Sequence, residues 1–351
     1  MRAVVYDRPG ARPEVREIDP PRCPADGVVV RVRATGVCRS DWHAWAGHDP
    51  VPLPMVPGHE FAGTVHQVAA GVTSWAVGDR VTVPFVVGCG RCTYCLAGDQ
   101  HVCPDQAQPG FTYPGSWAEL VAVPAAECNL VGLPDDVDFV AGAALGCRLA
   151  TSFRALRTHG RVVAGDVVAV HGCGGVGLAA VMIAKSLGAT VIAVDLGEPA
   201  RDLAAELGAD EVIDPAETPD VAARIHELTG GGARVSLDAV GSPAVSAASV
   251  ACLRRRGRHV QVGLLLGSDA TAGLPMDLVV SRELQILGSH GMPAGDYPAM
   301  LAMIADGTLD PRLLVHSVID LAAAPAALMA MDDPSAALGI TVISSDPGTP
   351  R

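Results

Sequence analysis

A chain of 351 residues is too long for one compact core, and its 49% apolar content is enough for a sizeable interior, so two domains are expected. The formal net charge of −13 repels phosphate backbones, which disfavours nucleic acid as a partner. No stretch approaches the ~20 apolar residues of a membrane helix, and the N-terminal residues lack the apolar run of a signal peptide, so we expect a cytoplasmic protein with no membrane partner.

The first part of the chain, up to residue 150, alternates short β-rich runs with Gly/Pro turns. This rhythm is typical of a β-barrel-like domain. The expected strands are Val28 to Val32, Gly63 to Val68, Arg80 to Val83 and Ala118 to Val123.

Two short motifs follow the first expected strand, GVCRSDWH at residues 36–43 and PGHE at residues 57–60. Cys38 and His59 offer a thiolate and an imidazole, both suitable zinc ligands, and Cys147 in ALGCRLATSF can supply a third. Three protein ligands leave a fourth position open for water or an alcohol. That open position distinguishes a catalytic zinc site from a structural one.

The segment GCGRCTYCLAGDQHVC holds four cysteines with short spacers. In a reducing compartment, clustered cysteines bind metal more often than they form disulfides. Four cysteine ligands around one tetrahedral ion leave no open position, which is the pattern of a structural zinc site. The expected ligands are Cys89, Cys92, Cys95 and Cys103.

From Gly165 the pattern changes to strand, glycine turn, helix and strand, in DVVAVHG, GGVGLAAVMIAKSLGA and TVIAVD. It continues through DEVID, ARVSLDAVG and GRHVQVGL with Ala-rich segments between them. Strands that alternate with helices predict a parallel, doubly wound sheet. Beyond it we expect a helix from Tyr297 to Asp306 and a terminal strand from Ile340 to Ser344.

The glycine turn has the G-x-G-x-x-G pattern at Gly172, Gly174 and Gly177. Between a strand and a helix, this pattern predicts a dinucleotide loop, with the pyrophosphate at the helix N-terminus. Asp195 ends the next strand, where a carboxylate binds ribose hydroxyls and repels a 2′-phosphate, so NAD is favoured over NADP. Arg201, six residues on, could partly accommodate that phosphate.

These motifs together resemble the zinc-dependent medium-chain alcohol dehydrogenase family, over nearly the whole chain. The resemblance implies an α/β protein with a GroES-like β-barrel catalytic domain and a Rossmann domain. The expected catalytic domain comprises residues 1–147 and 289–351, with a structural-zinc lobe at about residues 88–104, and the expected NAD-binding domain comprises residues 148–288.

The resemblance also implies residue roles. Cys38, His59 and Cys147 would bind the catalytic zinc, with Glu60 as an acidic neighbour able to approach the metal. Asp41 would orient His59, while Ser40 and His43 would relay the proton of a zinc-bound alcohol to solvent. Cofactor contacts are implied for Arg39, Thr151, Gly172, Gly174, Gly175, Val176, Gly177, Asp195, Val262 and Leu264, and substrate contacts for Phe85, Trp117 and Leu264.

One position departs from the family pattern. Ile340 stands where many relatives place a basic residue that reaches the phosphates, so cofactor affinity is reduced or another residue substitutes. Four cysteines receive no role: Cys23, Cys128, Cys173 and Cys252.

The expected activity is oxidation of a primary or secondary alcohol through a zinc-bound alkoxide, with hydride transfer to NAD. A polyol dehydrogenase is the main alternative, kept open by Glu119 beside Trp117. A non-zinc reductase on the same fold and a non-enzymatic zinc-stabilised binding protein are weaker alternatives. The family implies a homotetramer or homodimer.

Overall fold

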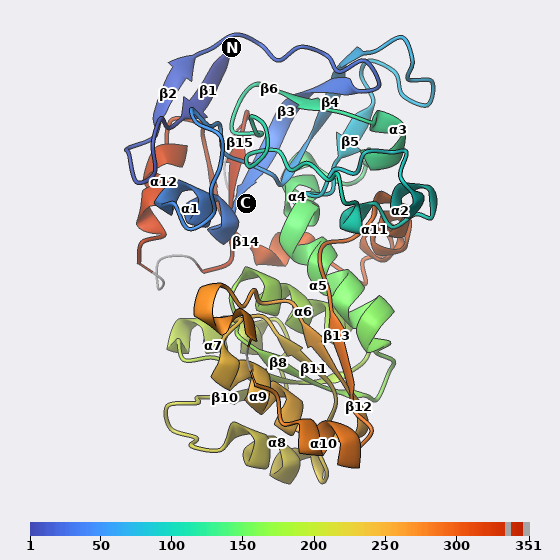
Figure 1. The fold of residues 1–351 in the computed structure, drawn as a ribbon, viewed down its shortest axis with the longest axis vertical. Helices are drawn as coiled ribbons and strands as arrows, with labels where there is room; N and C mark the ends of the chain where they lie inside the picture. The colour runs from blue at the N-terminus through green and yellow to red at the C-terminus, as the bar shows by residue number, and fades with distance from the viewer. Residues whose placement is uncertain (272, 334–337, 347–351) are drawn as a thin grey trace. The chain divides into compact units, whose positions relative to one another are not determined.

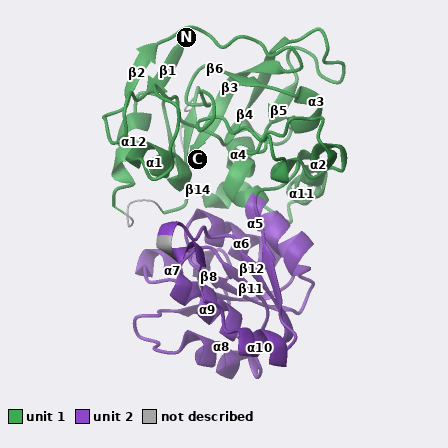
Figure 2. Ribbon diagram, viewed as in Figure 1, with its two compact units in different colours: residues 1–150, 291–351 green, residues 151–290 purple. Residues whose placement is uncertain are grey.

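The computed structural model describes residues 1–271, 273–333 and 338–346. The chain forms two compact units, shown in Figure 2. Unit 1 comprises Met1–Ala150 and Gly291–Arg351, and unit 2 comprises Thr151–His290. The sequence places the two boundaries after residues 147 and 288.

Unit 1 is built on a seven-stranded sheet that is antiparallel except for one parallel pair, β14 with β15. Its long central strand β3 pairs with β4 through a register that shifts twice, and it also pairs with β6 through residues 28–31 and with β15 through residues 34–37. Valines on the inward face of the barrel form one core cluster with Phe61. The strands of the sheet are β3 (Val28–Val37), β4 (Phe61–Val68), β5 (Arg80–Thr82), β6 (Leu120–Val123), β7 (Val131–Gly132), β14 (Val315–Ile319) and β15 (Ile340–Ser344).

A separate two-stranded sheet, β1 (Arg2–Val5) with β2 (Glu14–Glu17), packs over a second core cluster around Tyr6 and Trp117. Short helices fill the remaining surface of this unit (Figure 1). They are α1 (Arg39–Ala46), α2 (Thr93–Leu96), α3 (Ala126–Asn129), α4 (Phe139–Ala144), α11 (Tyr297–Ala305) and α12 (Ala324–Ala330).

Unit 2 is a six-stranded parallel sheet in the order β10-β9-β8-β11-β12-β13. The chain runs outward from β8 in one direction and then returns to continue from β11 in the other. The point between β8 and β11, where the order reverses, is where doubly wound sheets bind ligands. The strands are β8 (Val167–His171), β9 (Thr190–Val194), β10 (Glu211–Ile213), β11 (Ala233–Asp238), β12 (Leu253–Gln261) and β13 (Gln285–Gly288).

Crossover helices join these strands, as the alternating pattern of the sequence predicts. They are α6 (Gly175–Ser186), α7 (Glu198–Glu206), α8 (Val221–Thr229), α9 (Pro243–Ala251) and α10 (Met276–Ser281), with α5 (Ala150–Arg154) leading into the unit. The predicted fold class, a GroES-like barrel with a doubly wound domain, is confirmed. Within the described residues, no helix is long and apolar enough to cross a bilayer.

Candidate functional site

Four side chains of unit 1 bring metal-ligand atoms together: Cys38, His59, Glu60 and Cys147, whose ligand atoms lie within 4.8 Å of one another. Cys38 follows β3 directly, and His59 and Glu60 directly precede β4. Because β3 and β4 pair antiparallel, the end of one meets the start of the other, and the Gly36 amide donates to the Glu60 carbonyl at 2.7 Å. The sheet therefore unites two motifs separated by a loop.

The fourth side chain, Cys147, comes from a π-helical segment, Leu145–Leu149, that continues α4. A π turn is rare and costs regular hydrogen bonding, so it is frequently found at functional sites. The buried Tyr297 hydroxyl donates to the carbonyls of Leu145 (3.3 Å) and Gly146 (3.4 Å) and so supports this turn.

His59 is oriented by the buried Asp41 carboxylate. Its Nδ1 lies 3.0 Å from Asp41 Oδ1, while Asp41 also accepts from the amides of Cys38 and Gly58, each at 3.0 Å. Burial disfavours the protonated form of His59, yet the charge of Asp41 raises the pKa of His59 well above its usual value. In the described part of the chain, His59 Nε2 is buried and has no hydrogen-bond partner.

An orphaned imidazole nitrogen beside two thiols is the arrangement that a metal completes, because a buried polar atom without a partner is costly. The residues present therefore fit a zinc ion held by Cys38, His59 and Cys147. A hydrogen bond from the Cys147 thiol, helped by the charge of Arg148, lowers the pKa of Cys38 well below its usual value and favours the thiolate that metal binding needs.

Glu60 lies in the cluster but is engaged by Arg148. The Arg148 amide and Nε each donate to Glu60 Oε1 at 3.1 Å, and Nη2 donates to Oε2. Both side chains are buried, with 7% of Arg148 and 0% of Glu60 exposed. Burial raises the pKa of Glu60, and the Arg148 charge opposes this rise. Sequence analysis missed Arg148; a charged residue inside the apolar run ALGCRLATSF was the available signal.

The two residues implied in proton transfer lie on α1, which begins after Cys38. Ser40 Oγ lies 3.8 Å from Cys38 Sγ. His43 Nδ1 lies 3.1 Å from Nδ1 of His48, which is exposed and was not singled out from the sequence. Burial and the Arg39 charge lower the pKa of His43.

Two aromatic rings stand against His59. Phe85, an expected substrate contact, lies edge-on with ring centroids 6.2 Å apart, and Phe111, which the sequence did not single out, lies at 5.3 Å. Trp117, also expected to line the cleft, is fully buried in the core around Tyr6, where its Nε1 donates to the Gly36 carbonyl at 3.0 Å. A large aromatic side chain serves a core and a pocket equally well, so its residue type did not distinguish the two places.

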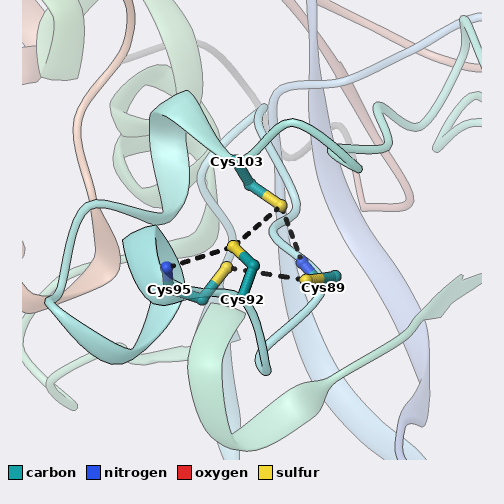
Figure 3. A group of neighbouring side chains, drawn as sticks. All are labelled: Cys89, Cys92, Cys95 and Cys103. Atoms are coloured by element: carbon teal, nitrogen blue, oxygen red, sulfur yellow. Dashed lines mark hydrogen bonds between the residues drawn. The ribbon is translucent and has the colours of Figure 1, made fainter.

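The cysteine quartet also comes together, as Figure 3 shows. The Cys89 and Cys95 sulfurs lie 4.0 Å apart, and those of Cys92 and Cys103 lie 3.7 Å apart. A tetrahedron with zinc–sulfur bonds of about 2.3 Å has edges of about 3.8 Å. The quartet therefore fits one zinc ion, and all four cysteines are free thiols rather than disulfides.

Main-chain amides support the charge of this quartet. Those of Arg91 and Cys92 lower the pKa of Cys89 to about 6. The Asn129 side chain clamps the start of the lobe, since its Oδ1 accepts from the Gly88 amide at 2.8 Å and its Nδ2 donates to the Gly88 carbonyl at 2.9 Å.

In unit 2, the three fingerprint glycines have different surroundings. A Cβ on Gly177 would lie 1.7 Å from the Gly172 carbonyl oxygen, so helix α6 packs against the turn only because Gly177 has none. Gly172 has a φ of +91°, which favours glycine. A Cβ on Gly174 would meet nothing within 4 Å. The turn therefore leaves open space at Gly174, where a pyrophosphate can approach the main chain of residues 174–176.

Asp195 closes the same loop, because its carboxylate accepts from the Cys173 amide at 2.6 Å and the Gly197 amide at 2.8 Å. Arg201 donates to the carbonyls of Asp195 and Leu196, and its Nη2 pairs with Asp214 at 2.9 Å. The guanidinium is thus already satisfied, which argues against a role in holding a 2′-phosphate.

Three other expected cofactor contacts also lie in unit 2. Thr151 is its first residue and is nearly buried. Val262 and Leu264 follow β12 at the carboxyl edge of the sheet, and the Val262 amide donates to the Asp238 carbonyl at 3.0 Å. Leu264 is 66% exposed.

Two expectations concern unit 1. Arg39 stacks over Trp42 with 4.0 Å to the ring centroid and donates to the Met331 carbonyl, so it is engaged within its own unit. Ile340, at the position of the missing basic residue, is fully buried as the first residue of β15, where an unpaired charge would be costly.

Comparisons with known proteins agree with this geometry. Residues 24–135 match the alcohol dehydrogenase GroES-like domain, and residues 175–306 match the zinc-binding dehydrogenase family. An alcohol dehydrogenase of Geobacillus stearothermophilus is 36% identical over 310 residues, which are 88% of this chain and 90% of that protein. The chain belongs to the zinc-dependent medium-chain alcohol dehydrogenase family.

Two further relatives show the breadth of this family. A sorbitol dehydrogenase of Halalkalibacterium halodurans is 35% identical over 82% of this chain and 83% of that protein. The solved alcohol dehydrogenase TADH from Thermus sp. ATN1 superposes with a TM-score of 0.91 at 31% identity, covering 98% of this chain and 99% of that one. The chain is accordingly a zinc-dependent oxidoreductase that acts on alcohols with NAD.

Proposed function

We propose that this dehydrogenase converts a primary or secondary alcohol into its aldehyde or ketone at a zinc site formed by Cys38, His59 and Cys147. The observation that carries the proposal is the buried His59 Nε2, which has no partner among the described residues while Asp41 fixes the other ring nitrogen. Zinc bound there supplies a Lewis acid that lowers the pKa of an alcohol hydroxyl.

The protein residues around this site would take the proton. Ser40 stands beside Cys38, and a hydroxyl can accept one proton while donating another without gaining charge. His43 lies further along α1, and its lowered pKa keeps the ring neutral and able to accept a proton at neutral pH. Its contact with the exposed His48 offers a route to water.

NAD would lie on the glycine loop of unit 2, with the phosphates at the N-terminus of α6. The open space at Gly174 and the position of Asp195 support this placement. Arg201 is paired with Asp214 and is therefore not free to bind a 2′-phosphate, so NAD is favoured over NADP. Thr151, Val262 and Leu264 are proposed nicotinamide-side contacts, and Arg39 is a proposed phosphate contact that would have to leave Met331.

An apolar alcohol is the better substrate candidate. Phe85 and Phe111 surround His59 with aromatic surface, which suits an aliphatic or aromatic chain rather than several hydroxyls. Glu119, which kept the polyol alternative open, accepts hydrogen bonds from Arg2. The Arg2 Nε donates to the Glu119 carboxylate at 3.0 Å, and the Arg2 main-chain amide donates to it at 3.1 Å. The sorbitol dehydrogenase relative keeps polyols as the second candidate.

A homo-oligomer in the cytoplasm is part of the proposal. The last strand of the sheet, β13, carries the exposed Ile286, and α10 before it exposes Met276 and Val280. An exposed apolar edge strand is a common pairing surface. Ten free cysteines suit a reducing compartment.

Metal analysis combined with a substrate panel tests the proposal. We expect two zinc ions per chain and NADH formation, followed by absorbance, with apolar alcohols faster than sorbitol. Cys147→Ser should lower the zinc content to one and abolish turnover. A protein with one zinc and no turnover on any alcohol would contradict the assignment, and a preference for sorbitol would select the polyol alternative.

A further inference from the structure

The ion pair between Arg148 and Glu60 is an unusual feature to find beside a metal site. Both side chains are almost fully buried, and Arg148 engages both carboxylate oxygens of Glu60. Removing two charges from water is costly, and a hydrophobic pair of similar volume is often as stable. Fold stability alone therefore does not explain why this pair is present.

Glu60 is close enough to be a ligand. One of its oxygens lies within 4.8 Å of the ligand atoms of Cys38, His59 and Cys147. A carboxylate is an ordinary zinc ligand, and a fourth protein ligand would close the site in the manner of a structural zinc. The chemistry proposed above needs the fourth position open.

The pocket around Glu60 is shaped for the ion pair. A Cβ on Gly36 would lie 2.5 Å from Glu60 Oε2 and 3.1 Å from Arg148 Nη2, and a Cβ on Gly146 would lie 2.9 Å from the Glu60 Cα. Gly36 thus leaves the room that this carboxylate and guanidinium occupy, and Gly146 lets its own segment pack closely against the main chain of Glu60. Neither has a positive φ, so backbone conformation does not require glycine there.

Charge balance points the same way. Two thiolates neutralise a Zn²⁺ ion, so a carboxylate added to the cluster would leave one excess negative charge in a buried place. Arg148 cancels the charge of Glu60 where it stands. Paired with Arg148, the carboxylate gains little from turning to the metal.

We propose that Arg148 is a positioning residue that holds Glu60 back from the metal, so that the fourth coordination position stays available to the alcohol. This inference rests on the proposed zinc site of Cys38, His59 and Cys147. It assigns Arg148 a function in metal coordination rather than in contact with substrate.

Cobalt substitution tests the inference without relying on turnover. Co²⁺ in place of the catalytic zinc reports its ligands through its visible spectrum, and imidazole serves as the probe for the open position. We expect Arg148→Met to change the spectrum and to weaken imidazole binding by on the order of tenfold, equivalent to about 1.4 kcal/mol, because Glu60 then occupies that position. Arg148→Lys, which keeps the charge, should be intermediate.

The double variant Arg148→Met with Glu60→Gln is the decisive control. With no carboxylate to turn to the metal, imidazole affinity and the cobalt spectrum should return to those of the wild type. Gly36→Ala disturbs the same ion pair without changing either partner. If Arg148→Met does not fold, Gly36→Ala replaces it in the test and should show the spectrum that is expected for Arg148→Met.

The outcomes separate the two proposals. A wild-type protein that takes up no cobalt at a site open to imidazole overturns the zinc assignment itself. A wild type that binds imidazole, together with folded Arg148→Met and Gly36→Ala proteins of unchanged spectrum and affinity, overturns the role of Arg148. If the double variant does not restore imidazole binding, the role of Arg148 is overturned too, because the weaker binding in Arg148→Met is then a structural effect and not one of Glu60.

Discussion

Replacing Asp41 by Asn probes the network that orients His59. The two side chains have the same shape, but the amide carries one acceptor oxygen where the carboxylate has two. Asp41 uses Oδ1 for His59 and Gly58, and it uses Oδ2 for the Cys38 amide. In Asp41→Asn, one of the two oxygens becomes an NH2 group. Either His59 and Gly58, or the Cys38 amide, then face a donor instead of an acceptor.

The cost can be estimated from these contacts. At 0% exposure the carboxylate has no water to replace a lost partner, and a hydrogen bond to a charged group contributes about 1.5–3 kcal/mol. Partners that orient a metal-binding histidine affect metal affinity by about 10–100-fold. We therefore expect Asp41→Asn to lower the affinity of the catalytic site for zinc by about 10–100-fold.

Competition with a chromogenic chelator measures this change, and the zinc of the cysteine quartet serves as an internal reference. Asp202→Asn, at an exposed position of α7, is the matched control and should leave both zinc affinities unchanged. If Asp41→Asn released zinc no more readily than Asp202→Asn, Asp41 would not orient the ligand. The interpretation of the unpartnered His59 nitrogen as a zinc ligand would then be wrong.

Three further predictions concern pH and the cofactor loop. Hydrogen bonds from the Ser74 hydroxyl and the amides of Thr73 and Ser74 lower the pKa of Glu127 to about 2. Ionised Glu127 therefore stabilises the fold fully at a pH above the pKa that this carboxyl has in the unfolded chain. This stabilisation is lost as pH falls toward 2. Because Glu127 is exposed, Glu127→Gln should cost about 1 kcal/mol of unfolding free energy in urea at pH 7 and much less near pH 2. An equal cost at the two pH values would refute this prediction. The lowered pKa of His43 predicts that alcohol oxidation declines only below pH ~6.5, and His43→Gln should remove that limb of the kcat/KM profile. Gly177→Ala should both destabilise unit 2 by about 1–3 kcal/mol and weaken NADH fluorescence binding, whereas Gly174→Ala should weaken NADH binding alone; equal melting temperatures for the two variants would contradict the geometry.

Residues that the sequence groups within one short segment also lie together in the structure. The quartet spans residues 89–103, and its short spacers already restrict four sulfurs to one neighbourhood. The glycine fingerprint is equally local, because each glycine answers a steric demand of the turn between β8 and α6. For both motifs, the spacing of the residues is itself explained by the local structure that they form.

Apart from the ligand set and Asp41, which the family resemblance supplied, sequence analysis missed residues whose place in the site depends on distant contacts. Arg148 and Glu60 are separated by 88 positions, and only the packing of the π-helical segment against the β3–β4 junction brings them together. Phe111 lies in an irregular loop whose path no periodicity predicts. Nothing in the letters LGCRL indicates a π turn rather than an ordinary helix.

Residue type alone also left ambiguities that burial resolves. Trp117 and Phe85 are both large apolar residues near glycine-rich segments, yet one fills the core and the other faces His59. Cys252, which had no assigned role, belongs to an apolar core cluster, where a thiol behaves as a small hydrophobe. Cys173, also without a role, is buried in the glycine turn, and its thiol lies 3.9 Å from the Val194 carbonyl oxygen.

Two hydrogen-bonded networks meet at the candidate zinc site and act on different ligands. Asp41 ties the start of α1 to His59, so it fixes the Cys38 amide, the imidazole and the segment that carries Ser40. The Arg148–Glu60 pair fixes the acidic neighbour. The two networks are neighbours in the chain, because His59 and Glu60 are consecutive residues.

Because neighbouring groups that share partners rarely act independently, substitutions in the two networks should not be additive. Asp41→Asn loosens His59, and a loosened ligand gives Glu60 more freedom to replace it once Arg148 is gone. We therefore expect Asp41→Asn combined with Arg148→Met to lose less zinc affinity than the sum of the two free-energy changes, since Glu60 then compensates as a ligand. An additive double variant would mean that Glu60 does not replace the loosened His59 as a ligand, even when Arg148 is absent.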